Sequence, residues 1–178
     1  MIINNLLLIA GTGNKSGKTT LACKVIEQHR EHGIIGIKIT PHFHETTPGL
    51  ILLSEKPGSS IYEETNPELQ KDSSRMLRAG ASKVFFAKVT DEDLLAVFKE
   101  ILKHIPTGIP IICESPALRY FIVPGLFIIM NSETSNKKNI SELLGLPHVM
   151  LKLDEIIKVK TLPIEFKDRK WSCSGDTL

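Results

Sequence analysis

The chain has 178 residues, of which 42% are hydrophobic and 24% are charged, a composition typical of a folded domain rather than of a disordered segment. This length suits one domain with a substantial core. The net charge of +2 is too small to indicate nucleic acid or a membrane surface as the main partner, and no apolar run reaches the ~20 residues of a membrane span.

The cysteines and the N-terminus suggest a compartment. Cys23, Cys113 and Cys173 are widely spaced and form no CxxC pair, so we expect unpaired thiols and a reducing cytoplasmic environment. The apolar N-terminal run lacks a basic region and a small-residue cleavage site, and we therefore expect no signal peptide.

The first forty residues predict a strand–loop–helix–strand unit. The run from Leu6 to Ala10 is continuously apolar and bounded by glycine, which is typical of a strand buried on both faces of a parallel sheet. Apolar side chains recur at helical spacing from Lys18 to Arg30, and Gly33 follows as a stop signal. A second apolar strand is predicted from Ile34 to Ile39.

Residues 40–71 form a polar excursion rich in Pro, Thr, Ser and Glu. Within it, "LILL" and "SIY" flank "SEKPGS", a pattern that suggests a short hairpin. Because long excursions in compact domains are often functional, we expect this one to face a substrate or a partner.

The second half of the chain alternates helices and strands. We expect a short helix from Asp72 to Ala79 with Asp72 as its N-cap, and a strand from Lys83 to Val89. The segment Thr90 to Asp93 resembles a capping box that opens the next helix. Three further buried strands are predicted at "IPIICE", "GLFIIMN" and "HVML".

Alternating strands and helices predict a three-layer α/β/α domain with a mainly parallel sheet over residues 1–160. Residues 161–178 are polar apart from Trp171, and we expect them to form a flexible C-terminal tail. Ligands of such sheets bind beyond the carboxyl ends of the strands, which directs attention to residues 11–19, Lys38, Glu114 and Asn131.

The sequence between the first strand and the first helix predicts a P-loop. Glycines permit a tight turn whose backbone amides surround phosphate oxygens, a lysine neutralises the outer phosphates, and the next hydroxyl contacts Mg²⁺. The residues assigned to nucleotide binding are Gly13, Asn14, Lys15, Ser16, Gly17, Lys18, Thr19 and Thr20. The standard spacing would place a glycine at Thr12, whereas here the first glycine is Gly11.

Two other interpretations of this loop were weighed. Gly11, Gly13 and Gly17 also form a loose dinucleotide fingerprint, which would suit a nicotinamide-dependent oxidoreductase. That fingerprint leaves the Lys-Thr pair unexplained and requires an acid after the second strand, where the chain has Lys38 and Thr40. The third interpretation is a helix start without any ligand.

Three further residues complete the predicted site. Glu114 follows a buried strand, where an acid can hold Mg²⁺ or position a nucleophile. Asp72 either assists the metal or only caps its helix. Lys38 either stabilises charge on a transferring phosphoryl group or is simply solvated. The predicted catalytic residues are Lys18, Lys38 and Glu114, and the predicted metal ligands are Thr19, Glu114 and Asp72.

Two weaker clusters remain open. Arg75 and Arg78 share a helix face, where they bind an anionic substrate or, as we favour, form a solvated basic face. His42, His44 and Glu45 suggest a metal cluster, although an ordinary polar loop is the favoured interpretation because a lone His-x-His pair is weak support.

The loop resembles that of dethiobiotin synthetase, which begins "GT" and ends "GKT" with the same spacing and belongs to the signal-recognition-type branch of P-loop proteins. In that enzyme a lysine ends the second strand, as Lys38 does here, and a later strand ends in Glu-Gly, where this chain has Glu114 and Ser115. The resemblance implies that Asn131 contacts an adenine base.

Residues 5–131 resemble the molybdopterin-guanine dinucleotide biosynthesis protein B family. Its loop ends "SGKTTL", as residues 16–21 do, and its Asp-Ser helix ends in Ala-Gly-Ala, as "KDSSRMLRAGA" does here. Residues 50–69 form an insertion relative to that family. The resemblance implies nucleotide binding and a homodimer.

The base is not decided by the sequence. The molybdopterin-type resemblance implies GTP, whereas "NKKN" at residues 136–139 lacks the acid of a guanine-reading Asn-Lys-x-Asp element, and Asn131 favours ATP. We expect an Mg²⁺-dependent NTPase or small-molecule kinase. The alternative is an accessory protein that binds nucleotide with little turnover.

Overall fold

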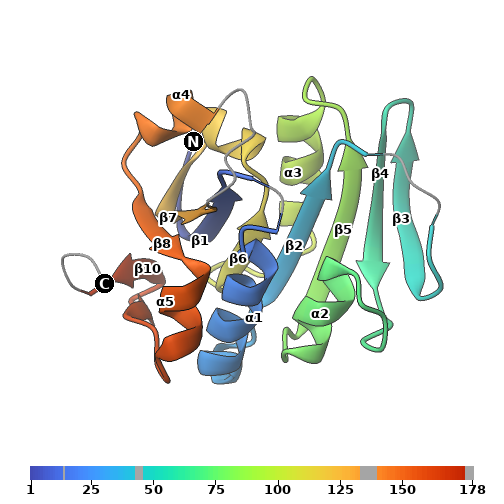
Figure 1. Ribbon diagram of the computed structural model, residues 1–178. Coiled ribbons are helices and arrows are strands. Elements are labelled where there is room, and N and C mark those ends of the chain that lie inside the picture. Colours follow the sequence, from blue (N-terminus) through green and yellow to red (C-terminus); the bar gives the residue numbers. More distant parts are fainter. Residues whose placement is uncertain (14, 43–45, 133–139, 175–178) are drawn as a thin grey trace.

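A computed structural model describes residues 1–13, 15–42, 46–132 and 140–174. Its centre is an eight-stranded sheet in the order β3-β4-β5-β2-β6-β1-β7-β8 (Figure 1). The strands of this sheet are β1 (Ile2–Gly11), β2 (Ile35–Thr40), β3 (Leu50–Lys56), β4 (Ser59–Glu64), β5 (Lys83–Val89), β6 (Ile111–Glu114), β7 (Val123–Asn131) and β8 (Val149–Lys152).

The sheet is mainly parallel, as the sequence predicts. Each neighbouring pair from β5 across to β8 runs parallel, and the β3–β4 and β4–β5 pairs are antiparallel. The hairpin expected in the excursion is therefore confirmed. It extends the sheet at one edge, where β3 is the outermost strand (Figure 1).

The helices and short 3₁₀ turns connect these strands. The α-helices are α1 (Lys18–Gln28), α2 (Asp72–Arg78), α3 (Leu94–Leu102), α4 (Ile140–Leu144) and α5 (Leu153–Lys158). The 3₁₀ turns are η1 (Arg30–His32) and η2 (Ala117–Tyr120). Within the described ranges, no helix is long and apolar enough to cross a membrane.

Two apolar cores lie against the sheet, because alternate residues of its buried strands point to opposite faces. Leu7 and Ile9 of β1 pack in the core that also holds the apolar side chains of α1, α2 and α5, which lie in front of the sheet in Figure 1. Leu6 and Leu8 pack in the other core, with the apolar face of α3. The side chains from Leu6 to Ala10 are completely buried, which confirms the predicted two-sided strand.

Two predicted helix starts differ from the structure. Asp72 is the first residue of α2 and not its cap, because Lys71 occupies the extended N-cap position. The predicted capping box at Thr90 is also wrong, since α3 begins at Leu94 after Asp93 and no side-chain hydrogen bond among the described residues caps it. In both places a carboxylate near a helix start has another partner or is exposed.

The C-terminal segment is not a flexible tail as far as Ser174. β9 (Ile164–Lys167) and β10 (Lys170–Cys173) pair as an antiparallel hairpin, which turns through Asp168 and Arg169 with φ values of 51° and 60°. Trp171 and Ile164 are completely buried in the core shared with α1. The polar composition of this segment does not reveal the hairpin, although Phe166 and Cys173 also pack against the same core.

We expect Trp171→Ala to destabilise the chain by about 3–5 kcal/mol, because truncating a large buried aromatic side chain leaves a cavity. Urea unfolding followed by far-ultraviolet circular dichroism would measure this, since the variant lacks the only tryptophan of the chain. Phe121→Ala, at a side chain that is 42% exposed, is the matched control and should cost about 1 kcal/mol or less. Equal effects of the two substitutions would contradict the buried hairpin.

Candidate functional site

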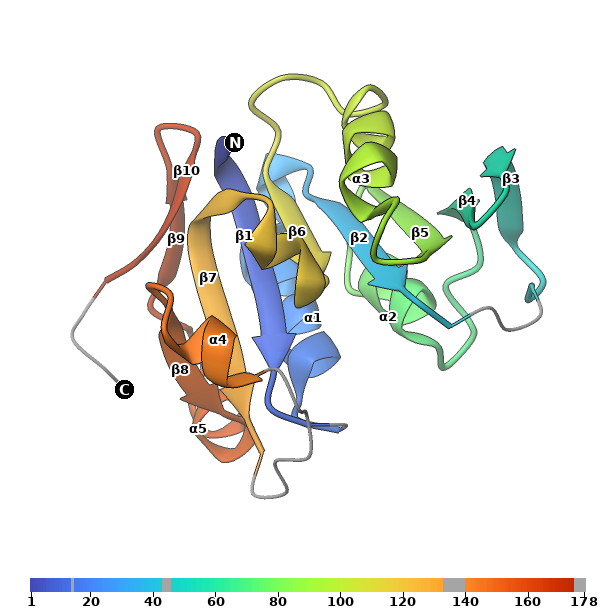
Figure 2. The same cartoon turned by 90° about the horizontal axis from the view of Figure 1, so that it is seen from above.

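The carboxyl ends of β1, β2 and β6 lie on the same side of the sheet, as the arrowheads in Figure 2 show. β6 pairs with β1 on one side and with β2 on the other, so the three ends are neighbours. This edge brings together the loop after β1, Lys38 on β2 and Glu114 on β6. The predicted site residues from these strands therefore converge.

The glycine-rich loop, residues 11–17, needs its glycines for conformation and for space. Gly17 caps the start of α1 with a left-handed φ of 89°, and Lys15 is also left-handed with a φ of 56°. A Cβ atom on Gly11 would lie 2.2 Å from the Ser16 hydroxyl oxygen, so any larger residue there would displace the Ser16 side chain. A loop with left-handed residues just before a helix turns backbone N–H groups towards a common point, which favours an anion.

Lys18, the first residue of α1, turns its side chain back over this loop. Its ammonium donates to the Gly13 carbonyl and to the Ser16 hydroxyl, both at 3.1 Å. The ammonium is therefore held next to the backbone of the loop. Lysine and helix N-terminus together concentrate positive potential at one place.

Thr12, the residue that departs from the usual P-loop glycine, anchors the loop to the end of β7. Its hydroxyl accepts a hydrogen bond from the Ser132 backbone N–H at 2.8 Å and lies 3.4 Å from the Asn131 side-chain oxygen. Its own N–H donates to the Met130 carbonyl at 3.0 Å. Thr12 is 4% exposed, so the departure has a structural role.

Lys38 bridges two carboxylates and is not a solvated lysine. Its ammonium lies 2.6 Å from Asp72 and 2.8 Å from Glu114. Lys38 and Glu114 are directly opposite each other in the β2–β6 register, so the sheet itself fixes this ion pair. The Asp72 carboxylate reaches it from the first turn of α2, and the Thr19 hydroxyl lines the same cleft.

Within this triad (Lys38, Asp72 and Glu114), the surroundings of Lys38 and of Asp72 favour the charged forms of these two groups. Burial alone would lower the pKa of Lys38, but Glu114 and Asp72 outweigh burial and raise it. Burial alone would raise the pKa of Asp72, but Lys38 and Thr19 bring it below its usual value. The stability that Asp72 contributes is therefore lost only as the pH falls through its lowered pKa, and that of Lys38 only as the pH rises through its raised pKa.

Glu114 keeps one oxygen for another ligand. Its side chain is buried, and only Oε2 contacts Lys38. Oε1 has no hydrogen-bond partner among the residues that the structure describes. Buried carboxylate oxygens are normally satisfied, so this atom, the Asp72 carboxylate and the Thr19 hydroxyl form an oxygen-rich set that suits a hard cation such as Mg²⁺.

Two adjoining clefts open at this edge. The Lys38 cleft, with a volume of about 640 Å³, is lined by loop residues Lys15 to Gly17, by the start of α1, and by Lys38, Asp72 and Glu114. The Asn131 cleft, of about 630 Å³, is lined by Asn131, Ser132, Lys152, Leu153, Asp154 and Ile157. Lys15, Ser16 and Leu153 border both clefts, so a single extended ligand can occupy the two together.

Arg75 and Arg78 make different contacts, and of the two only Arg78 is exposed. Arg75 borders the Lys38 cleft, donates to the Thr20 hydroxyl at 3.4 Å and lies 3.9 Å from the Asp72 carboxylate. Arg78 instead donates to the carbonyl oxygens of Pro67 and Leu69. The two arginines diverge because α2 packs with one side towards α1.

The excursion contributes only its first residues to the described part of the site. Thr40, Pro41 and His42 line the Lys38 cleft, whereas the β3–β4 hairpin forms the distant edge of the sheet. Asn14, His44, Glu45 and residues 136–139 lie outside the described residues, and the expectations for them stay predictions.

Sequence reasoning missed one wall of the site. Leu153, Asp154 and Ile157 come from α5, which directly follows β8. The signal that could have found them is the position of β8, because residues directly after a parallel strand reach the ligand edge. Its "HVML" run was recognised, but the "KLDE" that follows was not considered.

Comparisons of the chain with protein-family models, with curated proteins and with solved structures found no match.

We expect Lys38→Met to destabilise the protein by about 3 kcal/mol at pH 7, because it leaves the buried Glu114 carboxylate without its cation. Adding Glu114→Gln should restore most of this loss, since the uncompensated charge is then gone. Urea unfolding of the two single variants and the double variant would measure the coupling.

The matched control is Lys83→Met, which breaks the more exposed ion pair with Glu63 at 3.0 Å. Such surface pairs contribute about 0–1 kcal/mol. A Lys38→Met loss no larger than that of the control would contradict the importance of the triad.

Proposed function

We propose that this chain is a P-loop nucleotide-binding protein with the three-layer α/β/α arrangement, which binds a nucleoside triphosphate with Mg²⁺ and hydrolyses it or transfers its γ-phosphoryl group to a small molecule. The observation that carries the proposal is Lys18, whose ammonium is held over the left-handed glycine-rich loop at the start of α1. This arrangement offers amides, a helix N-terminus and a fixed cation to one phosphate chain.

The charges that line the Lys38 cleft support the proposal that it holds the phosphates. Its lining includes the cations of Lys15, Lys18, Lys38 and Arg75, which are suited to the charge of a triphosphate. Phosphoryl transfer depends mainly on positioning and on electrostatic stabilisation, so a protein needs few covalent steps. The ammonium of Lys18 would neutralise the outer phosphates, and the guanidinium of Arg75 and the imidazole of His42 would face the second substrate.

Thr19, Asp72 and Glu114 fit Mg²⁺ by the chemistry of their oxygens. Oε1 of Glu114 is buried without a partner among the described residues, and Asp72 and Thr19 line the same cleft. When bound, Mg²⁺ would neutralise charge on the phosphate oxygens. In the nucleotide-free protein Lys38 holds both carboxylates, so it keeps them charged and oriented towards the same cleft.

The lining of the Asn131 cleft supports the proposal that it holds the base. It adjoins the loop through Lys15 and Ser16 and combines the Asn131 amide with two exposed apolar side chains, Leu153 and Ile157. A planar ring needs apolar walls for its faces and a few polar atoms at its edge. The Asn131 amide can pair with an adenine edge, which favours ATP, although the cleft also has the Asp154 carboxylate as an acceptor for a guanine edge.

A second candidate is an accessory protein that binds nucleotide and a partner with little turnover. It is favoured by the ion triad, because Lys38 occupies both carboxylates and leaves neither as an evident base for water. It also agrees with the resemblance to the molybdopterin-guanine dinucleotide biosynthesis protein B family, which implies a homodimer. Exposed Ile51 and Leu52 on the edge strand β3 offer an apolar surface for such a partner.

Nucleotide binding is tested by thermal unfolding with ATP, GTP or NADH, each with and without Mg²⁺. We expect one triphosphate with Mg²⁺ to raise the stability by about 2.7 kcal/mol at 100 times its dissociation constant. Lys18→Ala should abolish this stabilisation, whereas Lys103→Ala, at an exposed lysine beyond α3, should retain it. Stabilisation that survives in Lys18→Ala, or that occurs only with NADH, would contradict the proposal.

Turnover separates the two candidate functions. We expect the wild-type protein with its preferred triphosphate to release phosphate at a steady rate that Glu114→Gln lowers at least tenfold, because metal-contacting carboxylates act on the transition state. Nucleotide binding measured in parallel should change less than the rate. Binding without phosphate release, alone or with candidate small-molecule acceptors, would instead favour the accessory protein.

A further inference from the structure

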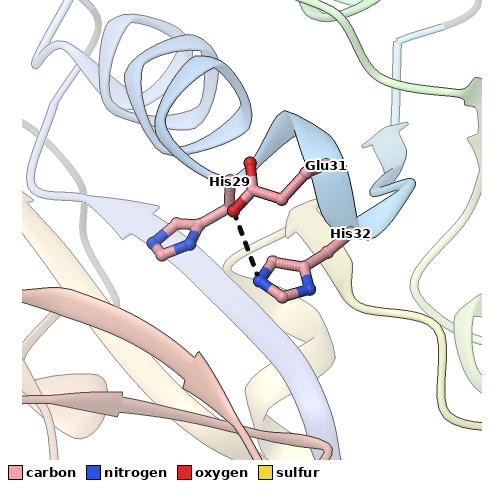
Figure 3. Close-up of side chains that lie close together, drawn as sticks. All are labelled: His29, Glu31 and His32. Carbon is pink, nitrogen blue, oxygen red and sulfur yellow. Dashed lines mark ion pairs between the residues drawn. The ribbon is translucent and has the colours of Figure 1, made fainter.

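A cluster of metal-ligating side chains lies at the opposite end of α1 from the glycine-rich loop. His29 follows the last residue of α1, and Glu31 and His32 belong to the adjoining turn η1. One ligand atom from each of the three side chains lies within 4.8 Å of the other two. Figure 3 shows that the two imidazoles and the carboxylate converge on one side of the chain.

The distances suit a small ion after minor side-chain rotation. The His32 Nε2 atom and the Glu31 carboxylate are 3.5 Å apart. Two ligands of a tetrahedral zinc ion with bonds of about 2.0–2.1 Å are separated by roughly 3.4 Å. The Glu31 side chain is 69% exposed, so it can rotate towards the imidazoles without displacing a neighbour.

The tautomer of His29 suits a ligand. Its Nε2 atom lies 2.7 Å from the Ile164 carbonyl oxygen, and two lone pairs would repel at this distance, so Nε2 carries the proton and donates. The lone pair of the neutral ring is then on Nδ1, and Figure 3 shows the ring with one nitrogen directed towards His32 and Glu31. Metal-binding histidines commonly donate their other N–H to a backbone carbonyl in this way.

The C-terminal hairpin holds both imidazoles in place. The His29 ring packs edge-on against Trp171 with centroids 5.4 Å apart, and the His32 ring packs edge-on against Phe166 at 5.6 Å. The intervening Arg30 is directed elsewhere, since it donates to the Ala79 carbonyl at 3.0 Å. The cluster therefore has two oriented nitrogen ligands and one carboxylate, with no cation from Arg30 beside it.

We propose that His29, Glu31 and His32 form a binding site for a divalent first-row transition ion such as Zn²⁺ or Ni²⁺, separate from the nucleotide cleft. Two imidazoles and one carboxylate suit these borderline ions and not Mg²⁺, which takes oxygen ligands. Solvent completes the coordination because Glu31 and His32 are at the surface. An ion held there links the end of α1 to the C-terminal hairpin through His29.

Calorimetric titration of the untagged, nucleotide-free protein with ZnCl₂ tests the site. We expect one equivalent to bind, with His32→Ala and Glu31→Gln each weakening the affinity at least tenfold, as loss of a ligand should cost no less than loss of an outer-shell contact. His104→Ala, which removes an exposed histidine on another part of the surface, should bind as the wild type does. Equal affinity of His32→Ala and the wild type would overturn the proposal.

Trp171 offers an independent readout. It is the only tryptophan of the chain and packs against His29, and open-shell ions such as Ni²⁺ quench indole fluorescence at short range. We expect saturable quenching by NiCl₂ in the wild type and in His104→Ala, and loss of that quenching in His32→Ala and Glu31→Gln. Quenching that is the same in all four proteins would overturn the assignment of the ion to this cluster.

Discussion

The candidate site is arranged around one buried carboxylate, which requires a cation beside it. Glu114 ends β6 between two strands and is 2% exposed, so its charge is tolerated only with a close partner. Lys38 supplies that partner from the directly opposed position on β2. The same ammonium attracts Asp72 and thereby orients the first turn of α2. The ion triad thus depends on the register of the sheet and on the placement of α2, and it contributes charges to the cleft.

The loop after β1 is positioned by its backbone conformation and hydrogen bonds and not by ion pairs. Gly11 and Gly17 give it the space and the left-handed conformation to turn into α1. Thr12 then links the loop to the end of β7, so the loop is fixed to the strand that carries Asn131. The clefts on the two sides of the loop are held in one relative geometry, which is what a ligand with two chemically different halves requires.

Much of the fold could be predicted because its strands carry a strong local signal. The apolar run from Leu6 to Ala10 and the loop glycines are informative without any knowledge of neighbours. The convergence of Lys38 and Glu114 also followed from the rule for strand ends. The hairpin around Trp171 and the divergence of Arg75 and Arg78 could not be predicted, because they depend on packing between distant segments. The ligand set of His29, Glu31 and His32 is local in the sequence, but the orientation of the His29 ring depends on the distant Ile164 carbonyl.

The order of the strands also has a consequence for synthesis of the chain. β1 is synthesised before its strand partners β6 and β7, so Leu6 is made long before Ile111, the residue opposite it in the sheet. Such non-local pairing slows folding and leaves apolar strands unprotected in the meantime. In the other core, which holds Leu7 and Ile9, the last completely buried side chain along the chain is Trp171, near the end of the described residues. The apolar run of β1 therefore stays without its strand partners until β6 and β7 have been synthesised.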